Sequence, residues 1–135
     1  MTVTREQWID EIRSWVGVPW VHQGRNRHGV DCIGLVIASA HALGLTEFDT
    51  RAYGRTPMGD FLVRMCNEHM TRKARAEPGD VLLMRMSKFP QHFAVLVEPG
   101  RIVHARGEDG RVVETNIPDA WCRRVVGVYA VPGVA

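Results

Sequence analysis

The chain has 135 residues, of which 45% are hydrophobic and 24% charged, and this composition excludes a disordered or fibrous protein. A chain of this length buries enough apolar surface to fold without disulfides or a structural metal, so we expect a single domain over residues 1–135. The net charge of +2 is spread along the chain with no basic stripe, which argues against nucleic acid as a partner.

Helical spacing of apolar residues predicts three helices in the first half of the chain. Thr4 and Gln7 have the spacing of a capping box, and Trp8 begins the apolar face of the helix that follows. Asp31 can cap the second helix, so Cys32 falls in its first turn. The predicted helices cover residues 4–17, 32–43 and 60–70, with a loop at residues 17–30 before the second helix.

The second half of the chain has the pattern of strands. Short β-branched or apolar runs alternate with turn residues such as Pro99-Gly100 and Asp109-Gly110. The predicted strands cover residues 81–86, 93–97, 101–104, 111–115 and 125–131. Helices followed by strands predict an α+β fold, with N-terminal helices packed on a five- to six-stranded antiparallel sheet.

Membrane insertion and secretion signals are not expected. The longest stretch without acidic or basic residues, residues 32–46, is shorter than the roughly 20 apolar residues that cross a bilayer. Residues 1–8 contain no apolar run and carry an acidic side chain, so we expect synthesis in the cytoplasm without a signal peptide.

The three cysteines fit neither a disulfide framework nor a zinc knuckle, because their spacing is wide and irregular. Cys66 and Cys122 are expected to pack as small apolar residues. His22, His28 and Cys32 are close in sequence and could ligate zinc, but no fourth ligand has regular spacing. We therefore expect no metal ion and no cofactor.

Cys32 is the strongest candidate for a nucleophile. The unpaired N–H groups at a helix N-terminus carry partial positive charge, which stabilises a thiolate, and they can also receive an oxyanion. The alternative that the sequence leaves open is that Cys32 is a small buried apolar residue.

His92 and His104 are the candidate base and its orienting partner, because each is a polar residue within an apolar strand. The alternative for each is a structural or exposed histidine. Side chains alternate between the faces of a sheet, so a strict two-residue turn at Pro99-Gly100 would place the two histidines on opposite faces. The catalytic interpretation therefore predicts a three-residue loop or a bulge, which would put His104 opposite Ala94 and on the same face as His92.

Five segments, taken together, resemble the NlpC-type family of cell-wall cysteine peptidases. In chain order they are Gly17-Val18-Pro19-Trp20, Gly29-Val30-Asp31-Cys32-Ile33-Gly34-Leu35, Pro78-Gly79-Asp80-Val81-Leu82, His92-Phe93-Ala94-Val95-Leu96 and Ile102-Val103-His104-Ala105. The resemblance implies a papain-like fold with the cysteine helix packed on an antiparallel sheet. It assigns the nucleophile to Cys32, the general base to His92 and the orienting residue to His104.

Within that family the chain resembles the phage-type peptidases of prophages and gene transfer agents, because of Val21-His22-Gln23-Gly24 and Trp121-Cys122-Arg123-Arg124. The resemblance also implies that Trp20, Gln23 and Asp31 bind substrate. Trp20 stands where the family usually has a tyrosine, and its indole N–H can donate but not accept. Ile33 stands where the family often has a serine that helps the aspartate bind the free amine of an L-Ala stem peptide, which argues against strict selection for that amine.

The implied function is hydrolysis of murein stem peptides, at the bond between γ-D-glutamate and diaminopimelate, through a thioester on Cys32. The implied partners are the peptidoglycan stem peptide and phage-like tail proteins, with action at the cell wall as part of a phage-like tail or particle. Two alternatives stay open: an N-acetylmuramoyl-L-alanine amidase of the Cys/His amidohydrolase class, and a non-catalytic tail-assembly module with the same fold.

Overall fold

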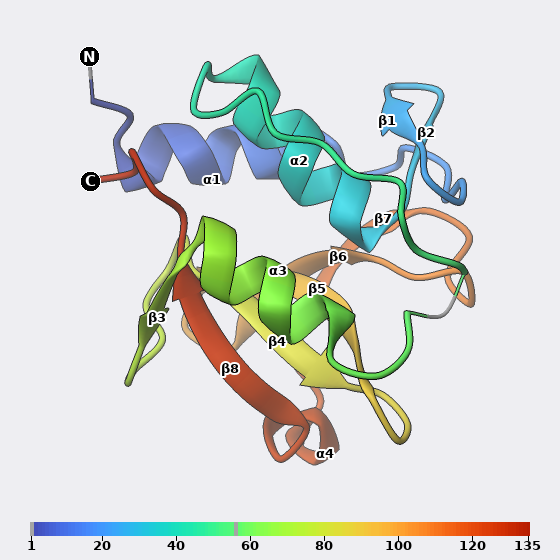
Figure 1. Ribbon diagram of the computed structural model, residues 1–135. Coiled ribbons are helices and arrows are strands. Elements are labelled where there is room, and N and C mark those ends of the chain that lie inside the picture. Colours follow the sequence, from blue (N-terminus) through green and yellow to red (C-terminus); the bar gives the residue numbers. More distant parts are fainter. Residues whose placement is uncertain (1, 56) are drawn as a thin grey trace.

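In the described part of the chain, three helices pack on one face of a six-stranded antiparallel sheet, and a fourth, short helix lies on the other face (Figure 1). The computed structural model describes residues 2–55 and 57–135. The helices are α1 (Arg5–Arg13), α2 (Cys32–Ala42), α3 (Phe61–His69) and α4 (Asp119–Cys122). In spatial order the strands of the sheet are β3 (Thr71–Lys73), β8 (Val125–Ala130), β4 (Val81–Arg85), β5 (Pro90–Glu98), β6 (Arg101–Ala105) and β7 (Val112–Asn116). A separate hairpin joins β1 (Arg25–Asn26) to β2 (Gly29–Val30).

The three helices and five strands predicted from the sequence are confirmed, and so is the antiparallel sheet. Thr4 and Gln7 form the expected capping box, but α1 ends at Arg13 and residues 14–17 continue as turns. The predicted loop at residues 17–30 was wrong in part, because it contains the β1–β2 hairpin. Strands of two residues are too short to show a periodicity, which is also why β3 and the four-residue α4 were not predicted.

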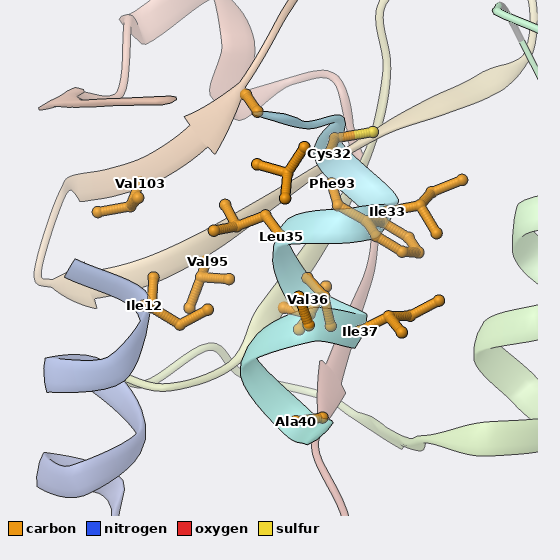
Figure 2. Packing of buried hydrophobic residues seen from close by; sticks show 14 of the residues in the cluster. Ile12, Cys32, Ile33, Leu35, Val36, Ile37, Ala40, Phe93, Val95 and Val103 are labelled. Carbon is orange, nitrogen blue, oxygen red and sulfur yellow. The ribbon is translucent and has the colours of Figure 1, made fainter. Parts of the chain in front are cut away.

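Helix α2 has apolar neighbours on every side (Figure 2). All residues from Cys32 to Ala40 are buried, and the helix packs against α1 and against strands β5 and β6. Its neighbours there include Ile12, Phe93 and Val103 (Figure 2). A helix without a polar face is stable only inside a core, so its position is fixed by packing. The start of α2, and with it Cys32, is therefore held firmly against the sheet.

The β5–β6 hairpin contains the irregularity that the catalytic interpretation predicted. Across the turn Glu98 pairs with Arg101, which is the register of a two-residue hairpin. One extra residue on β5, Val97, then shifts the register, so that Ala94 pairs with His104. The predicted bulge is confirmed, and it brings the two candidate histidines to the same face of the sheet.

The first and last described segments lie side by side next to the N-terminal end of α1 (Figure 1), where Val3 forms a bridge with Val134. Among the described residues, no helix is long and apolar enough to cross a membrane.

Asp80, a fully buried carboxylate in the turn before β4, ties three segments together. Its Oδ1 lies 3.2 Å from Arg5 Nη1 in α1, and its Oδ2 lies 2.7 Å from Lys73 Nζ in β3. Glu77 contacts the same two cations at 2.9 Å, but its side chain is 56% exposed. The two carboxylates therefore have the same partners and differ in their exposure to water.

Replacing Asp80 by Ala should lower the free energy of unfolding by about 3 kcal/mol, because Arg5 and Lys73 lose their buried carboxylate and keep only the exposed Glu77 as a partner. Urea denaturation monitored by tryptophan fluorescence would measure the loss. Glu77→Ala is the matched control and should cost much less, because solvent screens its contacts. Equal losses in the two variants would contradict the role of burial.

Candidate active site

Cys32 is the first residue of α2, directly after the N-cap residue Asp31. Only the N–H of Gly34 is capped by the Asp31 side chain, at 2.7 Å, so the N–H groups of Cys32 and Ile33 are left near the thiol. Burial raises the pKa of the Cys32 thiol to about 12, and the backbone N–H groups of Phe93, Ile33 and Cys32 oppose that shift. The N–H groups at the helix N-terminus lower the pKa of the thiol as expected, but the effect of burial, which raises it, is larger.

His92 and His104 form a buried pair. His92 Nε2 lies 2.8 Å from His104 Nδ1, and the two side chains meet edge to face over the small Ala94. Trp121 of α4 packs edge to face against His104, with 5.5 Å between the ring centroids. The bulge on β5 and the tryptophan together fix the orientation of both imidazoles.

A carboxylate lies on the far side of this pair. Asp109 Oδ2 is 4.0 Å from His104 Nε2 and also receives a hydrogen bond from Arg106 at 3.3 Å. A negative charge at this place favours a proton on His104 Nε2, which leaves Nδ1 as an acceptor for the N–H of His92. In that arrangement His92 Nδ1 is unprotonated and available to take a proton from a thiol.

Burial keeps both imidazoles neutral. It lowers the pKa of His92 well below the ordinary histidine value, with His104 and Arg106 adding to the shift. Burial also lowers the pKa of His104 to about 4, against the opposing effect of Asp109. Burial therefore disfavours a lone thiolate and a lone imidazolium alike, so a proton transfer between the two groups would create both charges together.

A cleft with a volume of about 400 Å³ opens over the thiol. Cys32, His92, Trp20 and Asp31 line it, together with the exposed Arg55. His104 does not line the cleft but contacts His92, which does. The structure therefore brings the predicted nucleophile, base and orienting residue together at one cleft, and it places two of the three predicted substrate-binding residues there.

Gln23, the third of these residues, holds a neighbouring loop in place. Its side-chain amide donates to the backbone oxygens of Arg51 and Tyr53 at 2.7 and 2.8 Å, and its own N–H donates to Asp31. Its φ of 60° is left-handed, a strained conformation for a residue that is not glycine. Direct substrate contact by Gln23 stays a prediction.

The zinc alternative is not supported by the geometry. His28 is exposed in the β1–β2 turn, whereas His22 stacks on Trp20 and meets Tyr53 edge to face. Within residues 2–55 and 57–135, no group of three or more histidine, cysteine or acidic side chains is arranged to hold a metal ion. Cys66 is buried as predicted, but the prediction for Cys122 was wrong, because α4 leaves that thiol exposed at the surface.

Sequence reasoning missed several polar residues at the site, among them Arg25, Tyr53 and Arg55. Arg25 and Tyr53 both bond to the Asp31 carboxylate, and Arg55 lines the cleft. All three lie in segments without periodicity, and the contacts between them span up to 28 positions. The one signal available was the presence of an aromatic residue and several arginines in otherwise irregular loops.

The fold and the site define the class of protein. Residues 17–130 match the NlpC/P60 family, and the chain belongs to that family. The α+β architecture with helices on a six-stranded sheet matches the solved structures of NlpC/P60 proteins, so the predicted fold is confirmed.

The chain is similar to two curated proteins in sequence and to a solved structure in fold. It is 22% identical over 116 residues to the murein DD-endopeptidase MepS/murein LD-carboxypeptidase of Escherichia coli, covering 86% of this chain and 57% of that protein. It is 27% identical to a probable endopeptidase of Haemophilus influenzae, covering 84% and 66%. An NlpC/P60 family protein from Bacillus cereus superposes with a TM-score of 0.75 at 17% identity, covering 98% of this chain and 41% of that chain. The chain thus spans little more than half the length of the Escherichia coli relative.

The lowered pKa values of His92 and His104 predict how Cys32 reacts with iodoacetamide. Alkylation at neutral pH should be slower in His92→Ala by about two orders of magnitude, because the thiol then has no acceptor for its proton. In the wild type the rate should persist as pH falls through 6.5, since burial keeps the pKa of both histidines below that value.

Peptide mapping by mass spectrometry would follow Cys32 and Cys122 in the same sample. The exposed Cys122 is an internal control, and its alkylation should be the same in both proteins. Equal rates at Cys32 would mean that His92 does not activate the thiol, and would favour the non-catalytic module.

Proposed function

We propose that the protein is a peptidoglycan endopeptidase that cleaves stem peptides with Cys32 as nucleophile, His92 as general base and His104 as the residue that orients His92. The observation that carries the proposal is the 2.8 Å contact between the two buried imidazoles at a cleft that also contains the thiol. A buried histidine pair beside a helix N-terminus has no evident structural purpose. Membership of the NlpC/P60 family and the names of the relatives support the same chemistry.

The first step is attack on a peptide carbonyl of the stem. His92 Nδ1 takes the proton from Cys32 as Sγ forms a bond with the carbonyl carbon, so that thiolate character and imidazolium develop together. His104 Nδ1 accepts the N–H of His92 and keeps the ring aligned during transfer. The N–H groups at the start of α2 stabilise the oxyanion.

The second step resolves the intermediate. The His92 imidazolium protonates the leaving amine as the carbon–nitrogen bond breaks, leaving a thioester on Cys32. Water then attacks the thioester, with His92 taking a proton from the water, and the thiol is regenerated as the acid product leaves. Trp20, which lines the cleft, can donate its indole N–H to a substrate oxygen but cannot accept a hydrogen bond.

The expected bond joins γ-D-glutamate to diaminopimelate, as in the family branch that the sequence resembles. Wild-type protein incubated with diaminopimelate-type peptidoglycan should release fragments that begin at diaminopimelate, identified by mass spectrometry. Cys32→Ala should release none, whereas Cys122→Ala, which removes an exposed thiol outside the cleft, should be fully active.

Products other than fragments that begin at diaminopimelate would lead to different conclusions. Release of whole stem peptides would identify an amidase, and cleavage at a D,D bond would keep the nucleophile but overturn the assigned bond. Substantial hydrolysis by Cys32→Ala would refute the nucleophile.

We further propose that the protein acts at the cell wall as part of a phage-like tail or particle. The proposal is supported by the resemblance of the segments around Gln23 and Trp121 to phage-type peptidases. An antibody against the chain should detect it in phage-like particles purified from the producing cells. Recovery only outside such particles would contradict this location and leave the enzymatic proposal intact.

A further inference from the structure

We propose that a basic surface beside the cleft binds the carboxylates of further stem peptides in murein while the cleft holds the one that is cleaved. The basic surface consists of Arg85, Lys88, Arg123 and Arg124. None of these four residues lines the cleft. The inference rests on the proposed function and adds an interaction surface outside the catalytic group.

Two segments form the basic surface, and neither contains an acidic residue. Residues 81–97 cover β4, the following turn and most of β5, and residues 120–135 cover most of α4 and all of β8. The first segment contains Arg85 and Lys88, the second contains Arg123 and Arg124, and both lack aspartate and glutamate. These positive charges are therefore not balanced within their own segments.

The sheet brings the two segments together at one end. Strands β4 and β8 are antiparallel neighbours, and Met84 pairs with Val125. The end of β4 therefore meets the start of β8, where the N–H of Arg85 donates to Arg124 O at 2.8 Å and Arg124 Nη1 donates to Met86 O at 2.9 Å. Helix α4 lies at the same end of the sheet as the turn between β4 and β5 (Figure 1). Basic residues that are distant in sequence thus gather in one region.

The charges of the basic surface are accessible to solvent. Arg85, Lys88 and Arg123 are exposed, and Arg124 is half-buried. Among the described residues none of the four has a carboxylate within ion-pair distance, whereas Arg64 on α3 contacts Asp60 at 3.1 Å. Clustered cations without a partner in the protein create a positive potential that attracts anionic groups.

The basic surface borders the cleft. Met86 and Gln91 line the cleft, and they lie on either side of Lys88 in the chain. On α4, Trp121 packs against His104 just before Arg123. An extended polymer held in the cleft can therefore reach the basic surface past α4 and the turn between β4 and β5.

Murein has the chemistry that this surface fits. Each stem peptide of the diaminopimelate type carries the α-carboxylate of its γ-linked glutamate, and guanidinium and ammonium groups bind carboxylates. Single exposed contacts of this kind are weak. Several of them on one polymer add up, because a stem peptide in the cleft keeps its neighbours at high effective concentration. Nucleic acid would gain no such benefit from the cleft, so murein is the favoured partner.

A variant with Arg85→Gln, Lys88→Gln and Arg123→Gln tests the inference. Arg124 is kept because its side chain also bonds to the turn after β4. Binding to intact sacculi is measured by sedimentation with Cys32→Ala as the parent protein, so that no substrate is consumed. The affinity should fall about tenfold at low salt, and the difference should disappear at about 1 M salt, where screening is strong.

The matched control carries Arg64→Gln, Arg75→Gln and Arg111→Gln, which remove the same charge from exposed residues elsewhere. Its affinity for sacculi should stay close to that of the parent. With Cys32 intact, the control and the basic-surface variant should cleave a single soluble stem peptide equally well. On sacculi only the basic-surface variant should have a higher KM, with an unchanged kcat.

Cys122 provides a local probe of the same surface. It is exposed and precedes Arg123, whereas Cys66 is buried, so Cys122 is the accessible thiol of Cys32→Ala. Soluble murein fragments of several linked stem peptides should slow its alkylation by iodoacetamide, a neutral reagent. The slowing should be absent in the basic-surface variant and present in the control.

Sacculi whose carboxylates have been converted to amides distinguish the possible partners. The parent should bind them no more tightly than the basic-surface variant binds untreated sacculi. Equal binding of untreated sacculi by the two triple variants, or full binding of amidated sacculi, would overturn the inference. So would tighter binding of duplex DNA than of sacculi through the same residues. Failure of the wild type to cleave a stem peptide would instead overturn the proposed function, and the binding comparison does not depend on that result.

Discussion

The single hydrogen bond between two buried imidazoles is the interaction on which the site depends. It exists because one extra residue, Val97, shifts the register of the β5–β6 hairpin and turns His92 and His104 to the same face. In a regular hairpin with the same turn they would lie on opposite faces. The rest of the arrangement supports that contact: Ala94 leaves space for the rings, and Trp121 closes the side away from the cleft.

Cys32 lies between two preorganised groups of polar side chains. On one side is the histidine pair, which we propose receives the Cys32 proton, and on the other the hydrogen bonds of Asp31 hold the N-terminus of α2. Contacts within each group hold its side chains in place, so little reorganisation is needed when substrate enters the cleft. The apolar body of α2 anchors this junction, because the helix is buried over most of its length and cannot shift without opening the core.

The parts of the structure that could be predicted were those with local causes. The capping box at Thr4, the N-cap at Asp31 and the alternation of strand residues depend on neighbours a few positions away, and they led to the fold. They also made Cys32, His92 and His104 candidates, to which only the family resemblance assigned roles. The closure of Asp31 by Arg25 and Tyr53 could not be predicted, since it depends on how three irregular loops meet. For the same reason the effect of burial on the thiol was not foreseen, although its place at a helix N-terminus was.

The burial that keeps the histidine pair neutral also affects the stability of the fold. In the unfolded chain the pKa of His104 returns to its ordinary value near 6.5, whereas in the folded protein burial holds it at about 4. Between pH 6.5 and pH 4 the unfolded state binds more protons than the folded state. The contribution of neutral His104 to the free energy of unfolding is therefore fully present above pH 6.5 and declines as the pH falls toward 4. The dry environment proposed to favour proton transfer from Cys32 thus makes the fold sensitive to acid, and the candidate site itself contributes to the conditions under which the protein stays folded.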